Sequence, residues 1–246
     1  MFNVIDLSPN LTVIDTGEEL NISSSAQEKI FSIWEQEKQK RGDDLFEGRI
    51  FNVTEITRET LTGFYIDYSV SLAQYRDPNL FDDIAVRPLA VSGLVECEQG
   101  IVFGLRNQNL TADAGQWELV ASGGVDDTVR LDDGTVDVRE QFLNELCEEI
   151  NLPVESVSKL LPIILLEDSE THVCDIVLET RLSVGADTLF PLFNECGREE
   201  YVSIDIIQQH NVKSFVQLMK GSITPATLEI LAHKGYVKLL GSPKLS

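Results

Sequence analysis

Basic residues are scarce in this 246-residue sequence: 19 Lys and Arg stand against 41 Asp and Glu, a formal net charge of −22. Proteins bind the phosphate backbone of DNA or RNA through positive charge, which this acidic chain lacks. We therefore expect no nucleic-acid partner. An anionic small molecule is still allowed, because net charge governs long-range steering, whereas contact chemistry depends on a local metal ion and a few arginines.

Paired cysteines and long apolar runs are also lacking. The four cysteines, Cys97, Cys147, Cys174 and Cys196, are far apart and form no C-x-x-C pair. There is no apolar run of about 20 residues, the length that spans a membrane, and no signal-peptide pattern. Repeats, low-complexity runs and flexible linkers are absent as well. These absences predict a reduced, soluble, cytoplasmic protein with no membrane partner. For the oligomeric state, a monomer and a homodimer both stay open.

A helix with an acidic face is predicted over residues 137–150. At about 100° per residue, its apolar and charged side chains fall on opposite arcs. The apolar arc holds Phe142, Leu143, Leu146, Cys147 and Ile150, and the acidic arc holds Glu145, Glu148 and Glu149. Like charges at this spacing repel by a few tenths of a kcal/mol per pair, so a positive group is expected beside them.

Three carboxylates on one rigid face suit a hard divalent cation. Mg²⁺ typically takes one or two carboxylates, several waters and the phosphate oxygens of a substrate. The acidic arc therefore predicts a Mg²⁺ site, with Mn²⁺ as an alternative ion, completed by a phosphate ligand. A merely solvated acidic face is the other interpretation of the helix alone.

The segments on both sides of this helix strengthen the metal-site interpretation. Residues 117–121 are predicted to form a strand, which Ser122, Gly123 and Gly124 follow. We expect the two glycines to form a left-handed turn that brings the backbone against the helix and its ligands. Asn151 and Pro153 are typical of a helix end with a left-handed residue followed by proline.

This order of strand, double-glycine turn, loop and acidic helix resembles the Nudix box. The resemblance implies a Nudix α/β/α sandwich with a mixed β-sheet, and it implies that Glu145, Glu148 and Glu149 are the catalytic metal ligands. The sequence departs from the pattern in four ways. Asn144 replaces an arginine, Asn151 replaces a glycine, the loop from Gly124 to Glu145 is six residues longer, and Val136 stands where an early acidic residue is expected.

Two parts are predicted along the chain: an α+β accessory module at residues 1–85 and the Nudix domain at residues 86–246. In the module we expect short strand-like pieces at 1–5 and 11–14, and strands at 49–56 and 64–70. We also expect a helix there from a capping box at Ser25 to about Lys40, stopped by Gly42. In the second part we expect strands at 88–95, 101–105, 117–121, 160–166, 173–180 and 201–206. Helices are expected at 211–220 and 224–235, the second with Thr224 as its cap and Pro225 in its first turn.

The module also resembles that of one Nudix branch, the UDP-sugar pyrophosphatases. The likeness lies in residues 33–35, 45–51 and 71–77, and the ending of the box at residues 145–153 is similar too. It implies hydrolysis of UDP-glucose or UDP-galactose to UMP and a sugar 1-phosphate. Arg76 and Arg106 are candidates for substrate contact, with ordinary salt bridges as the alternative.

Several alternatives stay open at the level of sequence. ADP-ribose or a dinucleotide could be the substrate of the same machinery, because the box recognises a diphosphate and a metal but not a base. The departures from the pattern also allow a catalytically weak module that binds a nucleotide without turnover. The general base is one of the three glutamates or a carboxylate from a later loop.

Overall fold

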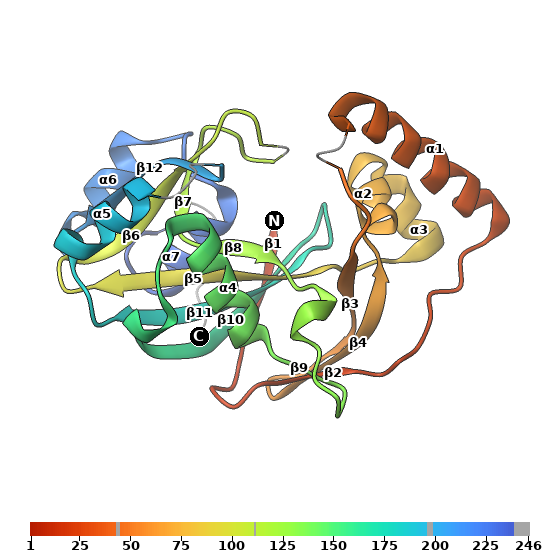
Figure 1. Cartoon of the computed structure of the whole chain (residues 1–246), viewed down its shortest axis with the longest axis horizontal. Helices are drawn as coiled ribbons and strands as arrows, with labels where there is room; N and C mark the ends of the chain where they lie inside the picture. Colours follow the sequence, from red (N-terminus) through yellow and green to blue (C-terminus); the bar gives the residue numbers. More distant parts are fainter. Residues whose placement is uncertain (43–44, 111, 196–198, 239–246) are drawn as a thin grey trace. The chain divides into compact units, whose positions relative to one another are not determined.

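The computed structural model describes residues 1–42, 45–110, 112–195 and 199–238 (Figure 1). The chain divides into two compact units, and neither is continuous in sequence. The first contains Met1–Val91, Gly123–Gln141 and Pro162–Ile176, and the second contains Ser92–Ser122, Phe142–Leu161 and Val177–Ser246. Residues 1–85, which the sequence predicts as a module, all lie in the first unit. This unit also contains three segments of the predicted second part: residues 86–91, 123–141 and 162–176.

The protein has the mixed α/β fold that the sequence predicts. Its strands are β1 (Phe2–Asp6), β2 (Thr12–Asp15), β3 (Arg49–Ile56), β4 (Thr60–Asp67), β5 (Leu89–Cys97), β6 (Gly100–Arg106), β7 (Trp117–Leu119), β8 (Ser122–Gly124), β9 (Thr135–Val136), β10 (Val157–Asp168), β11 (Cys174–Leu182) and β12 (Tyr201–Ile207). Its α-helices are α1 (Ser24–Arg41), α2 (Tyr68–Arg76), α3 (Phe81–Ile84), α4 (Val138–Ile150), α5 (Ala186–Glu195), α6 (Val212–Leu218) and α7 (Pro225–His233).

These strands form two sheets. The larger follows the order β1-β10-β11-β5-β6-β12, with β7 beside β6 and β8 beside β5, and the smaller follows the order β3-β4-β2-β9. β2 runs parallel to β4, whereas β3 pairs antiparallel with β4, so the smaller sheet is mixed. The smaller sheet packs against apolar side chains from helices of the first unit, among them Ala26 and Ile30 of α1 and Val70 and Ala73 of α2.

The lengthened loop before α4 adds a strand to the smaller sheet. Residues 135 and 136 form β9, which pairs antiparallel with β2 through Val13 and Val136. Val136 is 2% exposed. The Nudix pattern has an acidic residue at this position, but here the position lies in a buried strand. The extra residues serve the packing of the first unit.

Two predicted boundaries in the first unit are wrong. Helix α1 is capped by Ser23, whose Oγ accepts from the N–H of Ala26 at 3.3 Å, and not by Ser25. The predicted strand over 64–70 ends at Asp67, and Tyr68 begins α2, because Val70 and Ala73 are buried at helical spacing. The predicted stop of α1 at Gly42 is confirmed: its φ is 60° and its N–H donates to the carbonyl of Lys38.

Strand β6 is the centre of the second unit. It pairs antiparallel with β12, with β7 and, near the turn at Gly100, with β5. Helix α7 begins as predicted, with Thr224 as its cap and Pro225 in the first turn. Helix α5 is an element that the sequence analysis did not predict. No helix in the described ranges is long and apolar enough to cross a membrane.

Candidate functional site

Helix α4 has the ends that the sequence predicts. Asp137 precedes it and its Oδ1 accepts from the N–H groups of Arg139 and Glu140, both at 3.1 Å, which satisfies two free donors of the first turn. Asn151 follows it with a φ of 56°, and its N–H donates to the carbonyl of Cys147 at 3.0 Å. These local caps fix the length of the helix and thereby the positions of its glutamates.

The apolar face of α4 is largely as predicted. Phe142, Leu146 and Ile150 are buried, whereas Cys147, at the margin of the predicted arc, is exposed, so its assignment to the core was wrong. Phe142 lies against Gly93 of β5, where an added Cβ would stand 2.3 Å from its Cζ. The missing side chain at Gly93 lets the helix lie close to the strand.

The three glutamates of the acidic face differ in environment. Glu149 is buried, at 8% exposure, Glu145 is half-buried and Glu148 is exposed. Oε2 of Glu149 accepts from the N–H of Ser122 at 3.3 Å. Burial raises the pKa of the Glu149 carboxyl well above its usual range, and the negative charges of Glu200, Glu145 and Glu118 raise it further.

Two of these neighbouring carboxylates belong to an ion-pair network around Arg106. This residue ends β6, and its guanidinium pairs with Glu118 through Nη1 and with Glu200 through Nη2 at 2.9 Å. Its Nε donates to the carbonyl of Ala112 at 3.3 Å. Burial alone would lower the pKa of Arg106, but the charges of Glu118 and Glu200 outweigh it and raise that pKa.

Tyr201 of β12, the strand that pairs with β6 on one side, also belongs to this network. Its hydroxyl donates to Oε1 of Glu118 at 2.9 Å. The ring can lie over β6 because residue 104 is glycine, where an added Cβ would stand 2.4 Å from the ring of Tyr201. Burial nevertheless raises the pKa of Glu118, despite the opposing effect of Arg106. Glu118, Glu145, Glu149 and Glu200 thus form a glutamate cluster, in which Arg106 pairs with Glu118 and Glu200.

The charge and chemistry of the glutamate cluster fit a divalent cation. The cluster brings four carboxylates together in a partly buried place, and carboxylate oxygens are the ligands that Mg²⁺ and Mn²⁺ prefer. In the part of the chain that the structure describes, no three Asp, Glu, His or Cys side chains are placed so that they could already hold a metal ion. The ligand roles of Glu145, Glu148 and Glu149 stay predictions.

The predicted role of the double glycine was wrong in one respect. Gly123 and Gly124 lie in β8 and are not among the residues with positive φ, so they form no left-handed turn. An added Cβ at Gly124 would stand 3.1 Å from Cδ1 of Ile50, so this glycine leaves room for a neighbouring side chain. The contact between this segment and α4 is made by the N–H of Ser122. Substrate contact by Gly123 and Gly124 stays a prediction.

Arg76 lies on α2 in the first unit and forms a structural pair there. Its Nη2 donates to Oε2 of Glu37 at 2.8 Å, and Nζ of Lys40 lies 2.7 Å from the other oxygen of that carboxylate. The hydrogen bond from Lys40 lowers the pKa of Glu37 most, with a further contribution from Arg76. The partner is a glutamate of α1 rather than an adjacent aspartate. Nucleotide contact by Arg76 stays a prediction.

Three residues of this network were not predicted from the sequence: Glu118, Glu200 and Tyr201. One signal could have revealed the first, because Glu118 is the one charged residue in the apolar run of residues 117–121, and a charge in a buried strand needs a partner. Glu200 and Tyr201 carry no such signal. They reach the network only because β12 pairs with β6, with Tyr201 opposite Arg106.

No protein-family model matches the sequence, and no curated protein matches it. Several solved structures resemble part of the fold. The protein DR0079 of Deinococcus radiodurans is 15% identical, with a TM-score of 0.49 over 77% of this chain and 99% of its own. A bifunctional NMN adenylyltransferase/ADP ribose pyrophosphatase of Francisella tularensis is 14% identical, with a TM-score of 0.43 over 65% of this chain and 44% of its own. A NUDIX hydrolase of Nitrosomonas europaea is 11% identical, with a TM-score of 0.39 over 64% of this chain and 98% of its own.

Proposed function

We propose that this protein is a metal-dependent hydrolase that cleaves the diphosphate of a nucleoside diphosphate joined to another group. The observation that carries the proposal is Glu149, a buried carboxylate close enough to Glu118, Glu145 and Glu200 for their charges to raise its pKa. Burying ionised carboxylates together is costly unless a positive group compensates them. A divalent cation and a bound diphosphate supply such a partner and its remaining ligands.

In this proposal Glu145, Glu148 and Glu149 hold the cation, as the resemblance to the Nudix box implies. The bound ion would neutralise charge on the phosphate oxygens and acidify the attacking water. The chain itself fixes these carboxylates on one rigid helix, whose position depends on the contact between Phe142 and Gly93. The N–H of Ser122 holds the carboxylate of Glu149 in place.

Arg106 has a defined place in this proposal. Its guanidinium is held by Glu118 and Glu200 at the margin of the glutamate cluster. We propose that the phosphates of a substrate compete with Glu200, the more exposed of these two partners, for part of this guanidinium. Glu118 and Tyr201 would keep the arginine aligned meanwhile.

For the substrate we propose a UDP-sugar, UDP-glucose or UDP-galactose, with UMP and a sugar 1-phosphate as products. This choice is supported by the resemblance of residues 27–153 to the UDP-sugar branch, and ADP-ribose and dinucleotides are the alternatives to be compared. The test is a panel of UDP-glucose, UDP-galactose, ADP-ribose and a dinucleoside diphosphate, each with Mg²⁺ or Mn²⁺. Release of UMP at the highest kcat/KM supports the proposed substrate, whereas preferred release of AMP assigns the ADP-ribose alternative.

The same panel also separates an enzyme from a binding module. An enzyme gives turnover that requires the metal and is abolished by EDTA. If no substrate is cleaved while calorimetry shows that metal and nucleotide still bind, the hydrolase proposal is wrong and the protein is a nucleotide-binding module.

A further inference from the structure

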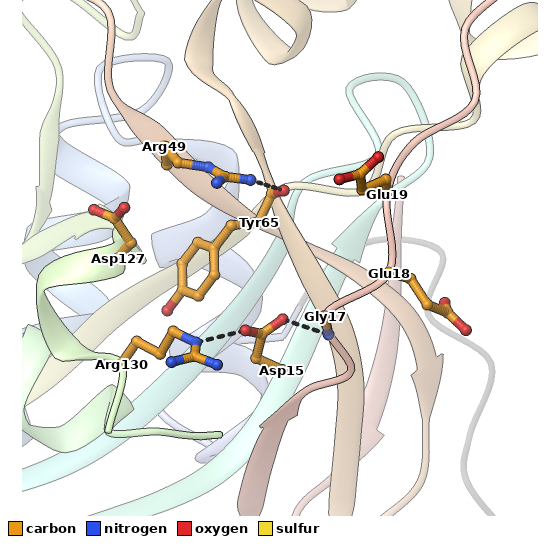
Figure 2. Close-up of a pocket in the computed structure, with 8 residues that line it drawn as sticks. All are labelled: Asp15, Gly17, Glu18, Glu19, Arg49, Tyr65, Asp127 and Arg130. Atoms are coloured by element: carbon orange, nitrogen blue, oxygen red, sulfur yellow. Dashed lines mark hydrogen bonds and ion pairs between the residues drawn. The ribbon is translucent and has the colours of Figure 1, made fainter. Parts of the chain in front are cut away.

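A polar pocket lies wholly within the first unit, and nothing in the proposed hydrolysis uses it. Its volume is about 190 Å³, and it is lined by residues of β2, β3, β4 and the loops that follow β2 and β8. The lining residues are Asp15, Gly17, Glu18, Glu19, Arg49, Tyr65, Asp127 and Arg130 (Figure 2). A cavity of about 150 Å³ holds benzene, so this pocket has room for a ligand of about six to ten non-hydrogen atoms.

Tyr65 presents an unsatisfied polar atom to this pocket. The residue is 6% exposed, and in the described part of the chain its hydroxyl has no hydrogen-bond partner. Figure 2 shows the ring between Arg49 and Arg130, with the hydroxyl directed toward the end where Arg130 and Asp15 lie. An unmade hydrogen bond at a buried hydroxyl costs about 1–3 kcal/mol, so a ligand that provides the partner is favoured.

The charges around the hydroxyl decide which partner fits. Two arginines and four carboxylates line the pocket, a formal excess of two negative charges. Arg130 is already paired, because its Nε donates to Oδ2 of Asp15 at 2.6 Å, and Arg49 donates through Nη2 to the carbonyl of Tyr65 at 2.6 Å. Within the described part of the chain, the carboxylates of Glu18, Glu19 and Asp127 make no hydrogen bond or ion pair, and they carry the excess charge.

The electrostatic surroundings of Tyr65 agree with this charge count. Burial raises the pKa of its hydroxyl, and the charges of Asp15, Asp127 and Asp126 raise it more than Arg130 lowers it. The hydroxyl therefore stays protonated and sits in a negative potential. An anion would be repelled there, and a neutral polyol would leave the two excess charges uncompensated. A positively charged hydrogen-bond donor satisfies both the oxygen and the potential.

We propose that this pocket binds a small aliphatic diamine. One ammonium group would donate to the hydroxyl oxygen of Tyr65, and both ammonium groups would offset the excess of carboxylates at the pocket. A chain of four methylenes with an ammonium group at each end has six non-hydrogen atoms and matches the available volume. Ligand binding here requires neither the glutamate cluster nor its hydrolytic chemistry.

The test is calorimetric titration with 1,4-diaminobutane, beside glucose and inorganic phosphate, on the wild type and on Tyr65→Phe. This substitution removes only the hydroxyl, which has no partner in the free protein, and it keeps the edge contact of the ring with Phe51 at 5.2 Å between centroids. Without ligand, Tyr65→Phe should therefore be no less stable than the wild type in thermal unfolding. We expect the diamine to bind the wild type and to bind Tyr65→Phe about tenfold more weakly, the loss of one charge-assisted hydrogen bond.

Asp127→Asn provides a second variant, because this exposed side chain contributes charge without supporting the core. We expect it to weaken diamine binding about three- to tenfold, whereas the matched control Asp82→Asn, on α3 and outside the pocket lining, leaves binding unchanged. Absence of diamine binding to the wild type would overturn the proposal. Equal affinity of the wild type and Tyr65→Phe, or preferential binding of glucose or phosphate, would do so too.

Discussion

The carboxylate of Glu149 accepts a hydrogen bond from the N–H of Ser122 at 3.3 Å, which joins helix α4 to the start of β8. This polar contact stabilises the charged form of Glu149, while its burial and three neighbouring glutamates act against that form. The carboxylate is thus held in position at a cost to the metal-free protein. Stability and the proposed function oppose each other at this residue.

The first prediction concerns the stability of Glu149→Gln without metal. The pKa of the Glu149 carboxyl is higher in the folded than in the unfolded protein, where it is about 4.3. Such a group contributes fully to folding stability below its unfolded-state pKa, and this contribution is lost as the pH rises through its folded-state pKa. The glutamine does not titrate. We therefore expect thermal unfolding in EDTA to show that the variant is more stable than the wild type at pH 8, and that the difference vanishes toward pH 4.

Magnesium supplies the control for this first prediction. Saturating Mg²⁺ should stabilise the wild type at pH 8 more than it stabilises Glu149→Gln, because the variant lacks one of the three proposed ligands. A variant less stable than the wild type at pH 8 in EDTA would contradict the account of Glu149 as a destabilising buried charge.

A second prediction concerns the ion pair between Arg106 and Glu118, whose side chains are 12% and 11% exposed. Arg106→Met leaves the carboxylate of Glu118 buried without its cation, although the hydroxyl of Tyr201 still donates to it. Removing one member of a buried pair costs about 3–5 kcal/mol, which urea unfolding would measure. The double variant Arg106→Met/Glu118→Gln should recover part of that loss. If the double variant is as unstable as the single one, the unpaired charge is not the cause.

A third prediction concerns the contact that positions α4. In Gly93→Ala the new methyl would stand 2.3 Å from Cζ of Phe142 and 2.6 Å from the carbonyl oxygen of Val120. Overpacking of this kind costs about 1–3 kcal/mol in the free energy of unfolding. Adding Phe142→Leu should restore only part of it, because the carbonyl contact remains. Gly48→Ala is the matched control, since its nearest neighbour would be 3.9 Å away, and a similar loss there would contradict the prediction.

The sequence predicts features of the fold that depend on nearby residues. The caps at Gly42, Asn151 and Thr224 are set by local backbone chemistry, and each ends or begins a helix as predicted. The acidic and apolar arcs of α4 follow from helical geometry, except for Cys147 at the margin. Boundaries where two patterns compete were placed wrongly, as at Tyr68, which continues the alternation of β4 and also begins the buried face of α2.

The candidate site could be predicted only in the part that one helix carries. Glu118 and Glu200 reach Glu149 because β7 and β12 both pair with β6, and strand order is a long-range property that local patterns do not encode. The prediction of a left-handed turn at Gly123 and Gly124 was wrong. Glycines also occur where a neighbouring side chain leaves no room for a Cβ atom, as Ile50 does at Gly124. The environment of Tyr65 likewise depends on the loop after β8, which lies far from it in sequence.

The central claim is that the glutamates of α4 support metal-dependent cleavage of a diphosphate, and initial rates on UDP-glucose with Mg²⁺ test it most directly. The wild type should be compared with Glu149→Gln and with Glu140→Gln, an exposed glutamate on the same helix outside the cluster. We predict Mg²⁺-dependent release of UMP that falls by a factor of order 10² or more in Glu149→Gln, as for the loss of a charge-stabilising group, and is retained in Glu140→Gln. Equal rates in all three proteins would contradict the account.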